Sequence, residues 1–246
     1  LHYPLRRQRQ MCIRDRVIFS VTAGAGFALA LPGILRRGAN LRRVWLTAFV
    51  VLLASALLYP LLAIPARWNV RMSDDAPTTL DGMSFMQATR YDDTAFDGSS
   101  RTIALNGEYE ALRWMQRNIS GSPVVVEAAP PDVGEAYRSI ASRVAMYTGL
   151  PTIIGWDWHQ TQQRAALSNN MIRRRMSDVA LLYNTTDPEE ALSVLRDYDV
   201  SYVYVGTQES LYYRPEGLQK FETMASAGSL RQVYHNSDVA IYEVVQ

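Results

Sequence analysis

The side chains best suited to chemistry stand close together between Gly155 and Arg164. Aromatic rings stack on the apolar face of a sugar, and planar polar groups hydrogen-bond its hydroxyls. The pattern therefore predicts a carbohydrate-binding site, and Asp157 and His159 could also do acid–base work. In the alternative interpretation, the tryptophans pack in the core and the polar groups cap a loop. The candidate substrate-binding residues of this stretch are Trp156, Asp157, Trp158, His159 and Arg164.

Cationic groups near this stretch could hold a phosphate or a carboxylate. Arg143 and Tyr147, together with Arg164, predict a cationic rim, because guanidinium groups bind such anions through paired hydrogen bonds. The basic run at residues 173–175 could contact lipid headgroups or a lipid-linked phosphate if it faced a membrane. A run of charges is also typical of a solvated helix face, and this alternative stays open.

Composition argues against several other kinds of site. The 25 basic and 24 acidic residues nearly balance, which argues against a nucleic-acid partner. One cysteine and three scattered histidines offer no metal-ligand spacing. The sequence also lacks the glycine-rich phosphate loops, the nucleophile elbow GxSxG and the zinc motif HExxH. These residues therefore predict no cofactor, no metal site and no identifiable catalytic residue.

Alternating strand and helix patterns place the candidate site in an α/β fold. The apolar runs 124–128 and 152–156 predict buried strands, and the site follows the second of them. In open α/β sheets, ligands bind beyond the carboxyl ends of strands. Residues 106–246 are therefore predicted to form a small, largely parallel, Rossmann-like domain with a C-terminal β-hairpin. Its other expected elements are helices at 106–121, 135–146, 160–183 (with a break near 168–170), 187–198 and 215–225, a strand at 200–205, and hairpin strands at 230–234 and 239–244.

Two apolar stretches precede this domain, at residues 17–35 and 44–64. Neither contains a charged residue. As a helix, each stretch has the length needed to cross about 30 Å of hydrocarbon. Residues 17–66 are therefore predicted to form two transmembrane helices. Small residues spaced four apart in the first stretch suit close packing against another helix.

Four arginines lie between the two stretches, within residues 36–43. Short loops rich in arginine stay in the cytoplasm, so everything after residue 66 is predicted to be extracytoplasmic. The protein would then be an integral protein of the cell membrane, with membrane lipid as a partner. The polar residues 67–105 are interpreted as a connector that lies as an extended strap over the domain.

Residues 1–16 are interpreted as foreign to the protein. The segment has no periodicity and resembles a translated sequencing adapter of the kind that contaminates metagenomic gene predictions, so it is excluded from fold reasoning. The alternative is a genuine basic arm beside the membrane. If the segment is foreign, the natural chain continues upstream and the present chain is its C-terminal end.

Three stretches resemble, in the right order, the C-terminal region of the uncharacterised YYY family of polytopic membrane proteins. They are SRVAMYTGLPTIIGWDWHQTQQR, LRDYDVSYVYVGTQESLYY and VYHNSDVAIYEV, and the similarity extends from about Ala104 to the end. Proteins of that family in turn resemble class C glycosyltransferases, which use a lipid-linked sugar. The family-like residues are Arg143, Thr148, Gly149, Pro151, Gly155, Trp156, His159 and Arg164.

This resemblance implies an activity for a longer protein rather than for the present chain. The catalytic carboxylate of such enzymes lies in a many-helix membrane part that these residues do not include. The chain would be the C-terminal fragment of a multi-pass glycosyltransferase, inactive alone, whose domain assists substrate binding. Its partners would be a polyprenyl-phosphate-linked sugar and further transmembrane helices, and a divalent metal could lie in the absent part. The alternative is a non-catalytic, membrane-anchored binding or interaction module.

Overall fold

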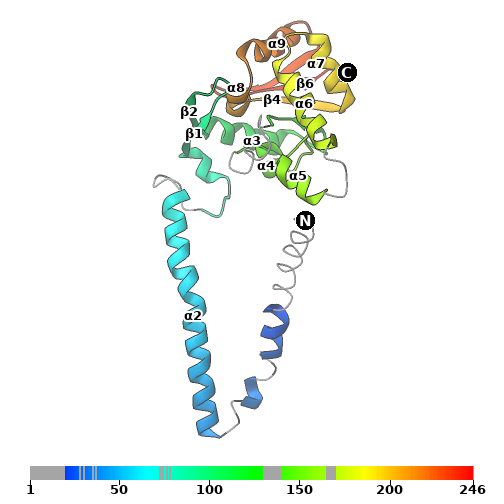
Figure 1. Ribbon diagram of the computed structural model, residues 1–246. Helices are drawn as coiled ribbons and strands as arrows, with labels where there is room; N and C mark the ends of the chain where they lie inside the picture. The colour runs from blue at the N-terminus through cyan, green and yellow to red at the C-terminus, as the bar shows by residue number, and fades with distance from the viewer. Residues whose placement is uncertain are drawn as a thin grey trace. The chain divides into compact units, whose positions relative to one another are not determined.

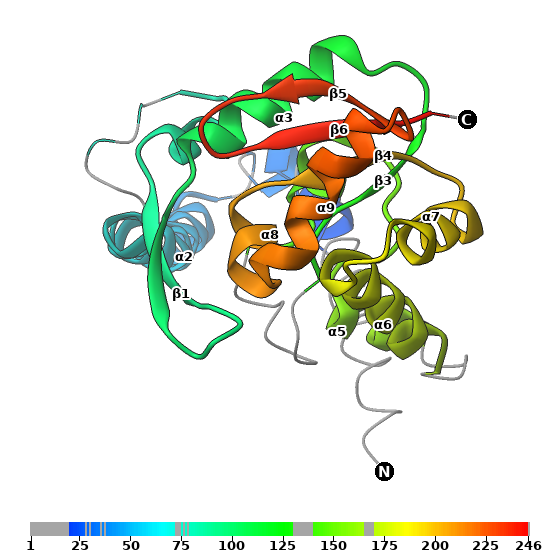
Figure 2. The ribbon, with the colours of Figure 1, turned by 90° about the horizontal axis from the view of Figure 1, so that it is seen from above.

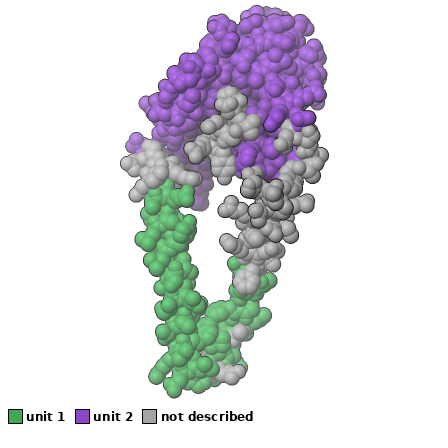
Figure 3. Space-filling model, in the orientation of Figure 1, with its two compact units in different colours: residues 1–71 green, residues 72–246 purple. Residues whose placement is uncertain are grey.

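The computed structural model describes residues 20–27, 29, 31–34, 36, 38–71, 75, 77, 79–129, 140–164 and 170–245. The chain divides into two compact units, residues 1–71 and 72–246, here called unit 1 and unit 2 (Figure 3). Unit 1 holds the apolar stretches, and unit 2 holds the α/β domain.

Unit 1 contains a long apolar helix, α2 (Ala39–Arg71), drawn in blue to cyan in Figure 1. Among the described residues it is the one helix with the length and apolarity to cross a membrane, over Ala39–Arg67 with a mean hydropathy of 2.3. None of that stretch is buried inside the protein, so its apolar side chains can face lipid or other helices. The expected span at 44–64 lies within α2.

The first apolar stretch is helical at residues 20–27 and 31–34. The ring of Phe27 stacks on the rings of Trp45 and Phe49 in α2, with centroids 5.2 and 5.4 Å apart. The remaining residues of the expected span at 17–35 lie outside the described part of the chain, so a second transmembrane helix stays a prediction.

Residues 79–104 of unit 2 are not an extended strap. They form a short 3-10 helix and an antiparallel hairpin, namely η1 (Ser84–Gln87), β1 (Arg90–Thr94) and β2 (Ser100–Ala104). The backbone N–H of Phe96 donates to the carbonyl of Leu211 at 2.8 Å, which ties the hairpin to α8 (Thr207–Tyr212). Most side chains of both strands are exposed or half-exposed, so their polar sequence conceals the strand pattern.

The main sheet of unit 2 has four strands in the order β3-β4-β6-β5. They are β3 (Val124–Val126), β4 (Val200–Val205), β5 (Leu230–His235) and β6 (Ala240–Val244). β3 and β4 run parallel, whereas the pairs β4–β6 and β6–β5 are antiparallel. The expectation of a largely parallel sheet is therefore wrong, because the predicted C-terminal hairpin places its second strand beside β4. The Rossmann-like order gains no support from this sheet.

The run 152–156 does not form the expected strand. It contributes one parallel bridge, between Thr152 and Val125. The carbonyl of Ile153 accepts a hydrogen bond from the Arg175 side chain at 2.9 Å instead of joining the sheet. The chain then turns at Gly155 into the next helix, so this β-branched run packs in the core without extending the sheet.

Helices cover both faces of the main sheet (Figure 2). They include α3 (Asn106–Asn118), α4 (Arg143–Thr148), α5 (Asp157–Gln163), α6 (Asn170–Asn184), α7 (Pro188–Asp197) and α9 (Pro215–Ser226). Trp114 of α3 packs on Tyr234 with ring centroids 5.2 Å apart, and Phe221 of α9 packs on Tyr242 at 6.1 Å. Tyr234 pairs with Ile241, the neighbour of Tyr242, so the two tyrosines point to opposite faces. α3 therefore covers one face and α9 the other.

The structure confirms some of the helices expected from the sequence and corrects others. The expected start of α7 is confirmed, since the Asp187 carboxylate accepts from the backbone N–H of Glu189 at 2.9 Å. The helical stretch expected at 160–183, with a break near 168–170, agrees with two helices, since α5 ends at Gln163 and α6 begins at Asn170. Of the helix expected at 135–146, residues 135–139 lie outside the described part of the chain, residues 140–142 are not helical, and α4 begins at Arg143.

Candidate functional site

The predicted sugar-binding residues lie on the short helix α5 and at its two ends. Trp156 is the N-cap residue, and its indole N–H donates to the carbonyl of Ala141 at 2.6 Å. The Trp156 and His159 rings lie against each other, with centroids 5.2 Å apart. These two contacts fix the start of α5 against the segment that leads into α4.

The residues of α5 differ in their access to solvent. Asp157 is 1% exposed, so its carboxylate belongs to the protein interior. Trp158 and His159 are half-buried, whereas Gln163 and Arg164 are exposed. Residues four apart on a helix share a face, so His159 and Gln163 lie on the same face of α5. α5 thus presents aromatic, imidazole and amide groups together, and Arg164 follows at its C-cap.

Arg143 does not belong to an exposed cationic rim, and that expectation is wrong. Its side chain is fully buried, as the first residue of α4. Nε donates to Glu108 at 2.5 Å and Nη2 donates to Glu209 at 2.6 Å, while Nη1 lies 3.9 Å from a Glu127 oxygen. The guanidinium also lies over the Tyr204 ring, 4.8 Å from its centroid. Because three carboxylates surround this cation inside the protein, it is not available to an outside anion.

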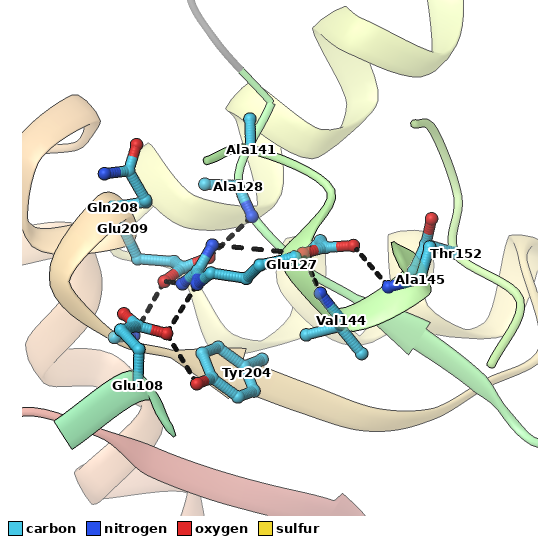
Figure 4. Close-up of polar contacts among 12 residues, drawn as sticks. Glu108, Glu127, Ala128, Ala141, Val144, Ala145, Thr152, Tyr204, Gln208 and Glu209 are labelled. Carbon is cyan, nitrogen blue, oxygen red and sulfur yellow. Dashed lines mark hydrogen bonds and ion pairs between the residues drawn. The ribbon is translucent and has the colours of Figure 1, made fainter. Parts of the chain in front are cut away.

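These five residues form one buried unit, called here the Arg143 cluster (Figure 4). Its members are Glu108, Glu127, Arg143, Tyr204 and Glu209, contributed respectively by α3, the end of β3, α4, β4 and α8. The Tyr204 hydroxyl donates to Glu108 at 2.6 Å. The cluster therefore joins five segments that are far apart in the sequence.

The cluster lies at the carboxyl ends of the two parallel strands. Glu127 directly follows β3, and its oxygens accept from the N–H groups of Val144 and Ala145 at 2.8 and 3.2 Å. Glu209 accepts from the N–H groups of Ala128 and Gly206 at 2.6 and 2.7 Å. The position where α/β folds commonly bind ligands is thus filled by internal hydrogen bonds.

Burial and the single cation set the charge states of the three carboxylates. Burial raises the pKa of Glu127 to about 7, and it also raises the pKa of Glu209. Burial opposes ionisation of Glu108 as well, but the charge and hydrogen bond of Arg143 hold its pKa below the usual value. Arg143 therefore favours the ionised form of Glu108, whereas burial favours the neutral forms of Glu127 and Glu209.

The backbone beside the cluster is locally strained. Ser142, which precedes Arg143, has a φ of 70°, in the left-handed region. This conformation costs about 1 kcal/mol or more for a residue with a side chain. The buried contacts of Arg143 keep the chain in this turn, and the turn aims α4 into the cluster.

Tyr147 lies at the other end of α4 from the cluster. Its carbonyl accepts from the Gln116 side chain of α3 at 2.6 Å, and burial raises the pKa of its phenol. Arg143 is enclosed in the cluster, and Arg164 is exposed beyond α5. The structure therefore does not bring Arg143, Tyr147 and Arg164 together as one rim.

Sequence reasoning missed the three glutamates as partners of Arg143. In the sequence, Glu108 suits the first turn of a helix and Glu209 follows a strand, so neither position alone indicates a buried contact. The most informative signal was Glu127, a charged residue directly after the β-branched run 124–126. A carboxylate at that position enters the protein interior and needs a buried donor or cation.

A metal centre is not evident in the described part of the chain. Across its ranges, no three His, Cys, Asp or Glu side chains are arranged to hold a metal ion. The three cluster glutamates surround a guanidinium, which occupies the space that a cation would need.

Comparison with known proteins gives a structural similarity but no match in sequence. No family model matches the sequence, and no curated protein matches it. A crystal structure of the C-terminal globular domain of oligosaccharyltransferase from Archaeoglobus fulgidus aligns with a TM-score of 0.34 and 16% identity. The alignment covers 55% of this chain and 95% of that domain. Similarity at this level does not establish a common function.

Proposed function

We propose that this chain is the C-terminal part of a multi-pass membrane glycosyltransferase that takes its sugar from a polyprenyl-phosphate carrier. Unit 2 assists substrate binding through α5, and the catalytic carboxylate belongs to a part of the protein that these residues do not include. The proposal is supported by the ordered resemblance to the YYY family from about Ala104 onward. A helix able to cross a membrane, α2, also precedes unit 2 directly.

The proposed topology has two membrane helices, at 17–35 and 44–64, with unit 2 outside the cytoplasm. The arginine-rich loop 36–43 supports this orientation. The stacking of Phe27 on Trp45 supports a helical hairpin, because it holds the first apolar segment against α2.

The observation that carries the proposed binding role is the composition and anchoring of α5. Trp158 and His159 are half-buried and Arg164 is exposed, so a ligand can reach an aromatic face, an imidazole and a guanidinium on one short helix. The Trp156–Ala141 hydrogen bond fixes the helix in place, which lowers the entropy lost on binding. A sugar stacked on Trp158 and a phosphate paired with Arg164 match these groups chemically.

The test is ligand binding by the full chain in lipid nanodiscs. Isothermal titration with a short-chain polyprenyl-phosphate sugar should give saturable heat. Trp158→Ala and Arg164→Gln should each weaken binding about 10-fold or more, since each removes a direct contact. Arg117→Gln removes the same charge from an exposed position of α3 and should leave affinity unchanged. Absence of binding, or equal affinity of all variants, would refute the role of α5.

A second candidate is a non-catalytic, membrane-anchored binding or interaction module. It is compatible with the burial of Asp157, which leaves α5 with groups that can bind a ligand but no accessible carboxylate. The two candidates differ in the gene upstream of residue 17. An open frame with further membrane helices and an external carboxylate supports the glycosyltransferase, whereas a start codon beside Val17 supports the module.

A further inference from the structure

The first half of α6 carries three consecutive arginines. Arg173 and Arg174 are exposed, and the Arg174 side chain has 76% of its surface accessible. The first turn of α6 contains no acidic residue. Positive charge near a helix N-terminus is opposed by the helix dipole, so the position itself does not favour these side chains.

One of the three arginines has a structural role. The Arg175 side chain donates to the carbonyl of Ile153 at 2.9 Å and lies 5.7 Å from the Tyr198 ring centroid. Those contacts hold α6 against the segment before α5. Arg173 and Arg174 make no comparable contacts with the protein core, so packing does not explain them.

The charges around these two arginines neutralise them only in part. Asp178 lies 3.6 Å from Arg174 and offsets one positive charge, and it also accepts a hydrogen bond from the Tyr198 hydroxyl. Arg164 and Arg173 have no ion pair among the described residues. At the end of α7, the charges of the exposed Arg196 and Asp197 cancel, and Asp199 follows them. The Asp157 carboxylate of α5 is buried. The patch formed by Arg164, Arg173 and Arg174 is therefore net positive.

Other exposed regions of unit 2 carry acidic side chains as well as basic ones. In the β1–β2 hairpin, Arg101 pairs with Asp97 at 2.8 Å, and Asp92 is also exposed. The start of α7 carries Glu189 and Glu190. Because α6 and α7 are joined by a short turn, those acids lie near the C-terminal end of α6, away from its arginines. Positive charge is thus concentrated where α5 and α6 meet.

A short tether keeps this patch near a membrane. Nine residues, 72–80, separate the end of α2 from Asp81, which the Tyr109 hydroxyl contacts in unit 2, and a fully extended chain of that length spans about 30 Å. A domain of this size is about 40 Å across. With α2 in the bilayer, unit 2 is held close to headgroups, whose effective concentration is high.

We infer that the patch of Arg164, Arg173 and Arg174 docks on anionic lipid headgroups and thereby sets which face of unit 2 meets the bilayer. Guanidinium groups pair with phosphate oxygens, and each arginine near an anionic surface strengthens association about 5-fold. Trp158 on the adjacent helix suits the interface, where tryptophan is enriched. The inference requires α2 to be in a membrane. It shares Arg164 with the proposed function but does not depend on glycosyl transfer.

The test measures the distance of α6 from the lipid surface in the full chain. A donor fluorophore is attached at Ser177→Cys, an exposed position of α6, in a Cys12→Ser background. The protein is reconstituted into vesicles that contain an acceptor-labelled lipid. The vesicles are either phosphatidylcholine alone or phosphatidylcholine mixed with phosphatidylglycerol.

Energy transfer should be higher in the mixed vesicles. The difference should shrink when added salt shortens the Debye length from about 30 Å to about 8 Å. R173Q/R174Q should lower the ratio of docked to undocked unit 2 about 25-fold and remove most of the difference. R117Q/R214Q removes two exposed arginines elsewhere and should keep it.

Two results would overturn the inference: equal transfer in both kinds of vesicle, or an equal loss in both double variants. If inorganic phosphate abolished the difference at constant ionic strength, the patch would be a site for single phosphate groups and docking would be rejected. R173Q/R174Q leaves Trp158 and Arg164 intact, so sugar binding by this variant should match that of the unmodified chain. A variant that no longer docks but still binds the sugar therefore tests this inference separately from the proposed function.

Discussion

Replacement of Glu127 by glutamine should change how the stability of unit 2 depends on pH. The side chain is fully buried, and burial raises its pKa from 4.5 to about 7. Between these two values, the folded protein keeps the proton on Glu127 while the unfolded chain has lost it. The folded state then binds more protons, so the free energy of unfolding falls as pH rises. The stabilising contribution is complete below pH 4.5 and is lost as pH rises through about 7.

The size of this effect follows from the two pKa values. A difference between 4.5 and about 7 corresponds to about 3 kcal/mol for a single group. Glutamine keeps a carbonyl oxygen that can accept from the N–H groups of Val144 or Ala145, but it has no charge to lose. Glu127→Gln should therefore remove about 3 kcal/mol of the decline across this pH range. Glu209, whose pKa burial also raises, would supply the decline that remains.

The assay is urea unfolding of the full chain in mild non-ionic detergent, from about pH 4.5 to about pH 8. Near-ultraviolet circular dichroism reports the buried tyrosines and tryptophans of unit 2. Glu222→Gln, at an exposed position of α9, removes a carboxylate outside the cluster and should keep the original pH profile. If Glu127→Gln declined as steeply as the unmodified protein, Glu127 would not hold the proton and the account of the cluster would be wrong.

Two further substitutions test the packing around α9. Burial lowers the pKa of Lys220 to about 7, so between that value and 10.5 the unfolded chain binds one more proton than the folded protein, and the free energy of unfolding rises with pH. Lys220→Met should flatten this rise, which is measured by urea unfolding near pH 7 and pH 9. An unchanged slope would contradict the assignment. A Cβ at Gly217 would lie 2.2 Å from the Tyr183 carbonyl oxygen, so Gly217→Ala should cost about 2 kcal/mol or more in the same assay. Gly82→Ala, where a Cβ has open space, is the matched control.

Local signals in the sequence predicted local structure well. Strand β4, helix α7 and the C-terminal hairpin lie close to their expected positions, because interactions between residues close in the sequence determine each of them. The Asp187 cap followed by proline and acids is one example. The Asn236 turn is another, since its side-chain oxygen accepts from the N–H groups of Asp238 and Val239 at 2.9 and 2.8 Å.

The features that sequence reasoning missed depend on contacts between distant segments. The run 152–156 has the composition of a strand, but a side chain from α6 takes the Ile153 carbonyl. The strands of the β1–β2 hairpin are polar because most of their side chains are exposed. The sequence does not show whether the Arg143 side chain is exposed or buried. Only the fold brings glutamates from three other segments around it. Residue type therefore indicated candidate chemistry but not accessibility.

Arg143 and α5 are nevertheless connected, through the segment that joins them. Glu127 holds the first N–H groups of α4, and Ala141, just before Arg143, accepts the Trp156 indole N–H. The Arg143 cluster thus positions the backbone to which α5 is anchored. Arg143→Gln leaves buried carboxylates without their cation, so it should lower the free energy of unfolding by about 3 kcal/mol or more and weaken ligand binding as well.

Trp156→Phe separates the two effects, because it removes the indole N–H and leaves the cluster intact. Sugar binding should weaken, while unfolding should change by only about 1 kcal/mol, the value of one hydrogen bond. Arg164→Gln should weaken binding with no change in unfolding, since its side chain is exposed. If Trp156→Phe bound ligand as tightly as the unmodified chain, α5 would not need its anchor. The family-like Arg143 would then act on stability alone.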